Sequence, residues 1–328
     1  MKKRFLILIL LCFVAFVCDI LFGSVNISLA HLWESLVSQE QPIYREIIIN
    51  YRLPKAFTAL FVGASLAVAG LLMQILFRNP LAGPDVLGIN SGASLGVALL
   101  TLGGASFPFF VSSAYAQVVA AILGASLILM LILLASTRVK STLTLLIVGV
   151  MFGYFTSSIV SILQNMSNPE TLKLFITWTF GSLSAVGWNE LVLLCAIQTT
   201  CLFFAFLLIK QLNVFLLGSE YAKGLGISVE RTRFYIIVIT AVLAGTATAF
   251  TGPIGFIGIT VPHIARGLFK TSNIKVILPA SVLCGATILM GCDIVSQLPL
   301  FNGVLPINAV TSLFGAPIIL WILARSKA

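Results

Sequence analysis

The chain of 328 residues is 59% hydrophobic and 9% charged, with a mean hydropathy of +1.11 and a net charge of +9. A soluble domain needs far more charge to cover its surface, so the composition excludes a soluble globular protein. It indicates a polytopic membrane protein whose residues 1–328 form one transmembrane domain. The cations lie in short segments between apolar runs, where they set membrane topology, and this distribution argues against nucleic-acid binding.

Apolar runs long enough to cross a bilayer recur along the chain. We predict an all-α fold with about ten transmembrane helices, near residues 5–22, 56–77, 87–102, 114–136, 143–163, 191–209, 234–250, 259–266, 278–297 and 306–324. Two polar segments, 24–54 with His31 and 164–190, are expected outside the membrane. Ten crossings place both termini in the cytoplasm, with fifteen Lys and Arg residues inside and four outside, as the positive-inside rule requires.

Two stretches have unusual composition for spanning segments. Gly63, Ala64, Ala67 and Gly70 leave one face of the second span nearly bare, which predicts close packing of another helix. The Pro- and Gly-containing turn from Arg78 to Leu87 is expected on the cytoplasmic side. Residues 251–258 are too rich in Gly and Pro for a lipid-facing helix, so they are expected to lie inside the protein or line a cavity.

The sequence contains no motif for chemistry. It has no G-x-x-x-x-G-K-[ST], no nucleophile elbow and no H-E-x-x-H, so we expect no enzyme activity and no ATP bound to this chain. Six cysteines lie in apolar stretches without a C-x-x-C pair, so neither a metal site nor a disulfide is predicted. An ion-coupled secondary transporter acting alone is the alternative from another class, but it would need carboxylates in mid-membrane, where this chain has almost none.

Three blocks, spread in order from about residue 50 to 320, carry a resemblance to a known family. The first reads R-L-P-K from Arg52, then G-A-x-L-A-x-x-G from Gly63, then Q-x-x-x-R-N-P-L-A-x-P-x-x-L-G from Gln74. The second comprises G-S-E-Y-A-K-G-L-G at 218–226, G-P-I-G-F-I-G at 252–258 and P-H-I-A-R at 262–266, and the third has L-P at 305–306 and G-A-P at 315–317. Together they resemble the FecCD-type permeases, the membrane subunits of ABC importers for ferric siderophores, haem and vitamin B12.

The resemblance implies a BtuC-like type II ABC importer fold in a bacterial cytoplasmic (inner) membrane. It implies two ATPase subunits that bind ATP-Mg, a periplasmic or lipid-anchored substrate-binding protein, and a second permease copy. A homodimer is the simplest assembly, and a heterodimer with a related permease stays open. The expected cargo is a ferric siderophore or similar metal chelate, with cobalamin or haem as alternatives among which no residue chooses.

The same resemblance assigns roles to residues. In the inner loop 210–233, the coupling element that docks on the ATPase is carried by Gly218, Glu220, Ala222, Gly224 and Gly226. Arg52 and Lys55, expected on the outer surface, match the cations that meet the binding protein. The inner gate is expected at Asn79, Leu81, Ser141 and Thr142.

Two departures from the family pattern put the docking geometry in doubt. The family often has another cation shortly after the Asp of the ninth span, whereas this chain continues from Asp293 to Gln297 without one. The family's E-x-P-x-G before the last span is replaced by V-L-P-I-N, so that Val304 and Asn308 stand at its first and last positions.

Overall fold

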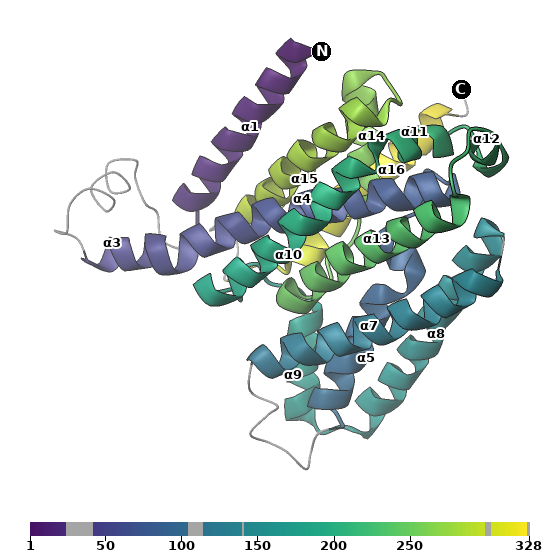
Figure 1. Cartoon of the computed structure of the whole chain (residues 1–328). Coiled ribbons are helices and arrows are strands. Elements are labelled where there is room, and N and C mark those ends of the chain that lie inside the picture. The colour runs from purple at the N-terminus through teal and green to yellow at the C-terminus, as the bar shows by residue number, and fades with distance from the viewer. Residues whose placement is uncertain (24–41, 104–113, 140, 299–302, 327–328) are drawn as a thin grey trace.

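The computed structural model describes residues 1–23, 42–103, 114–139, 141–298 and 303–326. His31 and the rest of the expected outer segment up to residue 41 lie outside them. The described residues fold into a bundle of helices (Figure 1). These are α1 (Lys2–Leu21), α3 (Pro42–Glu46), the π-helix η1 (Ile47–Arg52), α4 (Leu53–Phe77), the 3-10 helix η2 (Pro84–Leu87), α5 (Ile89–Thr101), α7 (Ala114–Arg138), α8 (Thr142–Met166), α9 (Pro169–Thr179), α10 (Trp188–Leu207), α11 (Ile209–Phe215), α12 (Ser219–Gly224), α13 (Val229–Thr251), α14 (Ile257–Phe269), α15 (Ile274–Ser296) and α16 (Ile307–Ser326).

The helices match the expected spans in order. Within the described part of the chain, 7 helices are long and apolar enough to cross a membrane: α1, the continuous helix that ends with α4, α7, α8, α10, α13 and α15. The shorter apolar segments in α5 and α16 lie where two of the other spans were expected. Helix α14, of 13 residues, lies where the third was expected, and the count of ten crossings stays a prediction. The second span differs from the expectation, because helical structure begins at Pro42 and runs without a break through η1 into α4.

Helix α4 is the centre of the bundle. Its span is 89% buried, against 22% for α1, α8 and α10, and it packs against α15, α13, α14, α10 and α1. The predicted bare face explains the close approach. A Cβ on Gly63 would lie 2.4 Å from the carbonyl oxygen of Gly285 in α15, and a Cβ on Gly70 would overlap Gly258 of α14. The prediction of close packing on this face is therefore confirmed.

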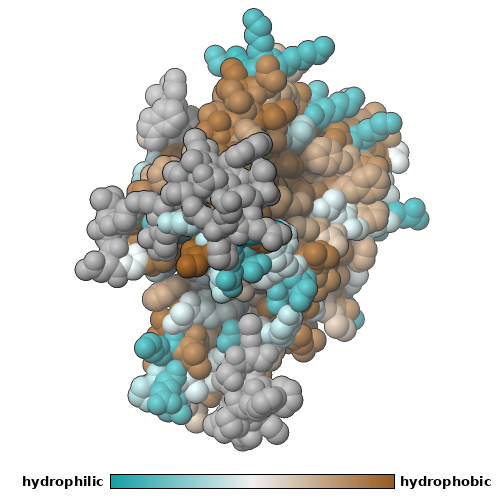
Figure 2. Space-filling model, turned by 90° about the vertical axis from the view of Figure 1, so that its left-hand side faces the viewer, coloured by the Kyte–Doolittle hydropathy of each residue, from teal (hydrophilic) through white to brown (hydrophobic). Residues whose placement is uncertain are grey.

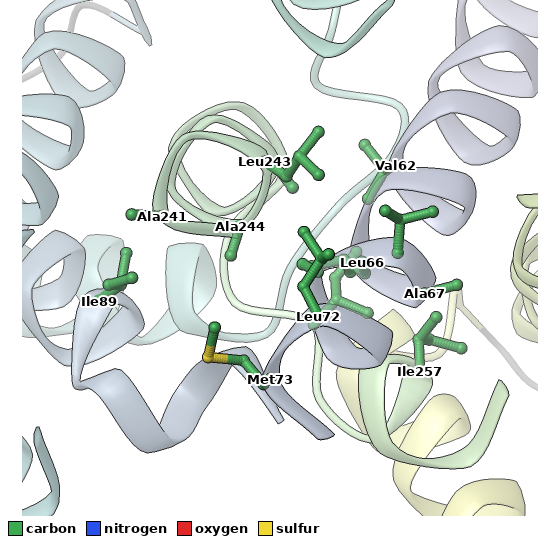
Figure 3. Close-up of a cluster of buried hydrophobic side chains, with 14 of the residues drawn as sticks. Val62, Leu66, Ala67, Leu72, Met73, Ile89, Ala241, Leu243, Ala244 and Ile257 are labelled. Atoms are coloured by element: carbon green, nitrogen blue, oxygen red, sulfur yellow. The ribbon is translucent and has the colours of Figure 1, made fainter. Parts of the chain in front are cut away.

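The apolar core surrounds α4 (Figure 3). Val62, Leu66 and Leu72 of α4 face Leu243 and Ala244 of α13. The side chain of Met73, also in α4, points toward Ile89 at the start of α5. All of these side chains are buried. Because lipid tails are as apolar as these side chains, the association depends on packing rather than on removal of water. The core thus holds α4 and α13 as a rigid centre.

Two irregular segments enter the bundle and change the expected course of the chain. Pro84 and the carbonyl oxygen of Leu66, halfway along α4, both lie against Gly258. The chain therefore turns back into the bundle after Arg78, and the expectation that everything from Arg78 to Leu87 lies at the cytoplasmic surface is wrong. Residues 252–256 between α13 and α14 form the second irregular segment, so α5 and α14 both begin inside the bundle.

The segments predicted to be cytoplasmic gather at one end, which we call the α12 end. There, Arg4 Nη1 donates a hydrogen bond to Leu268 O at 2.7 Å, and Arg233 Nη2 donates one to Val139 O at 2.8 Å. Arg78 lies against Gly218, just before α12. Figure 2 shows hydrophilic residues at the top of the face in view, hydrophobic residues directly below them, and a mixed surface farther down. The opposite end, where α3 lies, is the α3 end.

Candidate functional site

A polar cavity of about 460 Å³ lies between α5, α8 and α9 and is bordered by both irregular segments. Its walls carry mainly hydroxyl and amide groups. The lining residues are Asp85, Asn90, Ser91, Ser94, Ser157, Val160, Ser161, Gln164, Phe175, Thr179, Pro253, Gly255 and Asn308. Non-helical backbone at membrane depth is tolerated where it is buried in protein or lines a water-filled cavity. The expectation that residues 251–258 line a cavity is confirmed by Pro253 and Gly255.

Short hydrogen-bonded chains fix the polar groups of this cavity. Asn90 Nδ2 donates to Asp85 Oδ1, and Asn90 Oδ1 accepts a hydrogen bond from the Thr248 hydroxyl at 2.8 Å. On the opposite side, Asn308 Oδ1 accepts the backbone N–H of Gly255 at 3.1 Å. Asn308, a departure from the family pattern, thus anchors an irregular segment and contributes a polar group to the wall.

A smaller cleft of about 200 Å³ lies at the α12 end. Ser141 and Thr142 line it together with Arg78 and Arg233, and Ser141 also caps α8 by accepting the N–H of Thr144. The other two expected gate residues are not among its lining residues. Asn79 accepts the N–H of Leu81 within a tight turn at 2.9 Å, and Leu81 is 39% exposed. The structure brings one pair of gate candidates together, and the gating role stays a prediction.

The expected coupling element forms a short exposed helix, α12. The Glu220 side chain is 86% exposed and pairs with Lys223 at 3.2 Å, while Ala222 is fully buried beneath it. Gly224 is the last residue of α12, and Gly226 follows with φ +76°, which favours glycine. Tyr221 and Leu225 are more than half exposed beside Glu220. The helix can therefore present a mixed apolar and acidic surface, and ATPase docking stays a prediction.

Arg52 and Lys55 do not lie on the surface, so their expected exposure is wrong. Lys55 Nζ lies 3.3 Å from Asp19 Oδ1 of α1 and 2.8 Å from Asp293 Oδ2 of α15, and all three side chains are at most 5% exposed. We call these three residues the charge cluster. Arg52 is 6% exposed and donates to the carbonyl oxygens of Ile20 and Leu21 at 2.7 and 2.6 Å. Docking through these two cations stays a prediction that their burial disfavours.

The other departure from the family pattern, the lack of a cation between Asp293 and Gln297, lies in the same region. Gln297 Nε2 donates a hydrogen bond to Asp293 Oδ2 at 2.7 Å. An amide therefore lies beside the charge cluster where a further cation was expected, and Lys55 forms an ion pair with each carboxylate. The charge cluster lies at the α3 end, because it joins the last turns of α1 and α15 to the first turn of α4.

Sequence reasoning missed two features. Asp85 falls in the turn that was expected on the cytoplasmic side, although its position between Pro84 and Gly88 was a signal of irregular backbone. The three residues of the charge cluster were not connected with one another, although all three lie near the ends of apolar spans, which was the unused signal. Among the described residues, no group of three or more His, Cys, Asp and Glu side chains could hold a metal ion.

Comparison with known proteins agrees with this architecture. The model of the FecCD transport family matches residues 8–325. A vitamin B12 import system permease protein, BtuC, of Vibrio cholerae is 36% identical over 90% of this chain and 88% of its own. A hemin transport system permease protein, HmuU, of Yersinia pestis is 33% identical over 93% and 90%.

A solved structure, described as an inward-facing conformation of a metal-chelate type ABC transporter, superposes with a TM-score of 0.88 at 31% identity. That match covers 99% of this chain and 100% of the other. The sequence, the order of helices and the solved fold therefore agree over nearly the whole length. The chain belongs to the FecCD transport family.

Proposed function

We propose that this chain is the permease subunit of an ATP-driven importer that moves a ferric siderophore or similar metal chelate across a bacterial inner membrane. The observation that carries the proposal is a polar cavity in the membrane domain of a FecCD family member. Cobalamin and haem are the alternative cargoes, because relatives of similar identity are named for each. ATP-Mg belongs to a separate ATPase subunit.

The assembly we propose contains two permease copies, two ATPase subunits and one substrate-binding protein. Ser157 and Ser161 line the cavity on an exposed side of α8, where a second copy related by a two-fold axis would close it. The ATPase would seat on α12 at the α12 end. Both chain termini would then lie in the cytoplasm, with the α3 end toward the binding protein.

The test is affinity purification of the tagged chain from its native membrane in mild detergent. An ATP-binding subunit should copurify in roughly stoichiometric amount and be lost with Glu220→Arg, because that substitution reverses the charge of the exposed α12 surface. Glu170→Arg on α9 is the matched control, since it makes the same change at another exposed helix start. If no ATPase accompanies the unmutated chain, the importer is refuted and ion-coupled transport by this chain alone becomes the hypothesis to test.

A further inference from the structure

Among the described residues that line the polar cavity, Asp85 is the one with an ionisable side chain. The other polar lining groups are hydroxyls and carboxamides, which bear no charge. Helices α5 and α8, which form two of its walls, contain no Asp, Glu, Lys, Arg or His at all. The cavity therefore contains one carboxylate that no cation of its lining neutralises.

The start of α5 offsets only part of this charge. A helix N-terminus carries a partial positive charge of roughly +0.5, and Asp85 precedes Ile89, the first residue of α5, by one turn. Within the described part of the chain, its carboxylate accepts a side-chain hydrogen bond from the neutral amide of Asn90. The balance at this point of the wall is therefore negative. At the other irregular segment, the N–H of Gly255 is already taken by Asn308 and offers no anion site.

Asp85 is the second residue of the 3-10 helix η2, which leads directly into α5. An ionisable group at membrane depth is costly and is expected to act on whatever passes it. Asn308, which departs from the family pattern, faces the same cavity. Asp85 and Asn308 thus add a carboxylate and a carboxamide to the hydroxyl and amide groups of this cavity.

We propose that Asp85 makes the polar cavity selective for metal chelates with an uncharged or cationic periphery of amide, hydroxamate and hydroxyl groups. Chelates that expose free carboxylates, such as ferric citrate or haem with its two propionates, are disfavoured. This inference rests on the proposed function and narrows its cargo. The walls can exchange hydrogen bonds with amides and hydroxamates, whereas an exposed carboxylate would approach Asp85 without a cation to pair with it.

The size of the discrimination follows from Coulomb's law. Two like unit charges about 6 Å apart disfavour each other by about threefold in water and on the order of 100-fold at an effective dielectric constant of 20. A cavity that holds water lies between these limits. We therefore expect a change of at least about threefold when the charge of Asp85 is removed.

The test measures the potential of the cavity directly and needs neither the ATPase nor the binding protein. Ser161→Cys is introduced into the full chain in lipid nanodiscs, and its labelling by cationic and anionic methanethiosulfonates is followed by mass spectrometry of its own peptide. The ratio of the cationic to the anionic rate should fall at least about threefold with Asp85→Asn. Glu230→Gln, which neutralises an exposed carboxylate at the start of α13, should leave the ratio unchanged.

Chelates are then added as protecting agents. Ferrichrome, a neutral ferric trihydroxamate, should slow the labelling of Ser161→Cys when Asp85 is retained. Ferric citrate at equal concentration should slow the labelling only when Ser161→Cys is combined with Asp85→Asn. Ser94→Cys on α5 repeats the measurement from the other wall if Ser161→Cys does not fold. Any of three results would overturn the proposal. The ratio of the cationic to the anionic labelling rate could stay the same after Asp85→Asn, the cysteine could react with neither reagent, or both chelates could protect it equally. ATPase copurification is independent of all these outcomes, so the two proposals can fail separately.

Discussion

The charge cluster and the polar cavity use the same side-chain chemistry in opposite ways. In the cluster, Asp19 and Asp293 enclose Lys55 within 3.3 Å, and helices exclude solvent from all three. In the cavity, Asp85 shares its wall with serines and amides and has a neutral partner. Burial with a counter-ion fixes helices to one another. A carboxylate beside an open volume is free to act on a passing molecule.

The contrast shows that charged groups inside this membrane protein have two roles, one in stability and one in selectivity. Desolvating an ion is expensive, so a buried ion stays only where partners compensate it, and removal of one partner exposes the full cost. Asp85 lines an open volume and joins no two helices through an ion pair, so its removal should change selectivity more than stability. The following substitutions break or sharpen this contrast.

The largest effect is expected from Lys55→Met. The substitution leaves two buried carboxylates without their ion partner, which typically costs about 3–5 kcal/mol. We expect loss of most of the folded chain, measured as the monodisperse fraction in detergent and its apparent melting temperature. Adding Asp19→Asn and Asp293→Asn to Lys55→Met should recover part of the loss. Equal stability of Lys55→Met and the unmutated chain would show that the charge cluster does not hold the helices.

Gly285→Ala should have a smaller effect. The new Cβ would lie 2.3 Å from Gly63 O and 2.6 Å from Ala67 Cβ, so α4 and α15 must move apart. Overpacking of this kind typically costs about 1–3 kcal/mol, which thermal unfolding in detergent would register. Gly291→Ala in the same helix has no atom within 4 Å of the new Cβ and is the control. If both variants melt alike, close approach is not what joins these helices.

Ser157→Phe tests the cavity side of the comparison. The ring should fill part of the 460 Å³ volume and lower chelate uptake by roughly tenfold, equivalent to about 1.4 kcal/mol. The melting temperature of the single chain in detergent should not change, because Ser157 lies on an exposed side of α8 in that chain. Ser158→Phe makes the same change at an exposed neighbour outside the lining set. Unimpaired uptake by Ser157→Phe would remove the cavity from the transport path.

Lys223→Met should have the smallest effect. It breaks the exposed pair with Glu220, whose side chains are 59% and 86% exposed, and such pairs contribute at most about 0.5 kcal/mol. The melting temperature should stay within error, in contrast to the same substitution at Lys55. A large loss from Lys223→Met would mean that α12 is held by its ion pair rather than by buried Ala222.

The fold could be predicted well from the sequence, because membrane spans depend on local composition. The apolar runs gave the order of helices, and the spacing of Gly63 and Gly70 gave the close face of α4. Whether a side chain points into the bundle or out of it was harder to predict from the sequence. Arg52 and Lys55 look like surface cations at the end of a span, and only the meeting of α1, α4 and α15, far apart in sequence, shows that they turn inward.

The candidate site was the least predictable part. Asp85 follows two prolines and a glycine in a stretch typical of a surface turn, and re-entry into the bundle depends on the packing of Pro84 against Gly258. No local pattern contains that long-range contact. The role of Asn308 likewise follows only from its hydrogen bond to Gly255, 53 residues away. Both residues required the tertiary arrangement.

The central position of α4 has a consequence for biosynthesis. Its main neighbours α13, α14 and α15 follow it by roughly 150 to 200 residues, which a ribosome adds in about 10–40 s. Until then, the small-residue face of the nascent α4 has no helix packed against it. Asp19 is already synthesised and can hold Lys55 during this interval, whereas Asp293 arrives last. The N-terminal helix α1 is therefore the helix that can pack against α4 until the later helices have been synthesised. Chains that end before α15 should be substrates for membrane quality-control proteases.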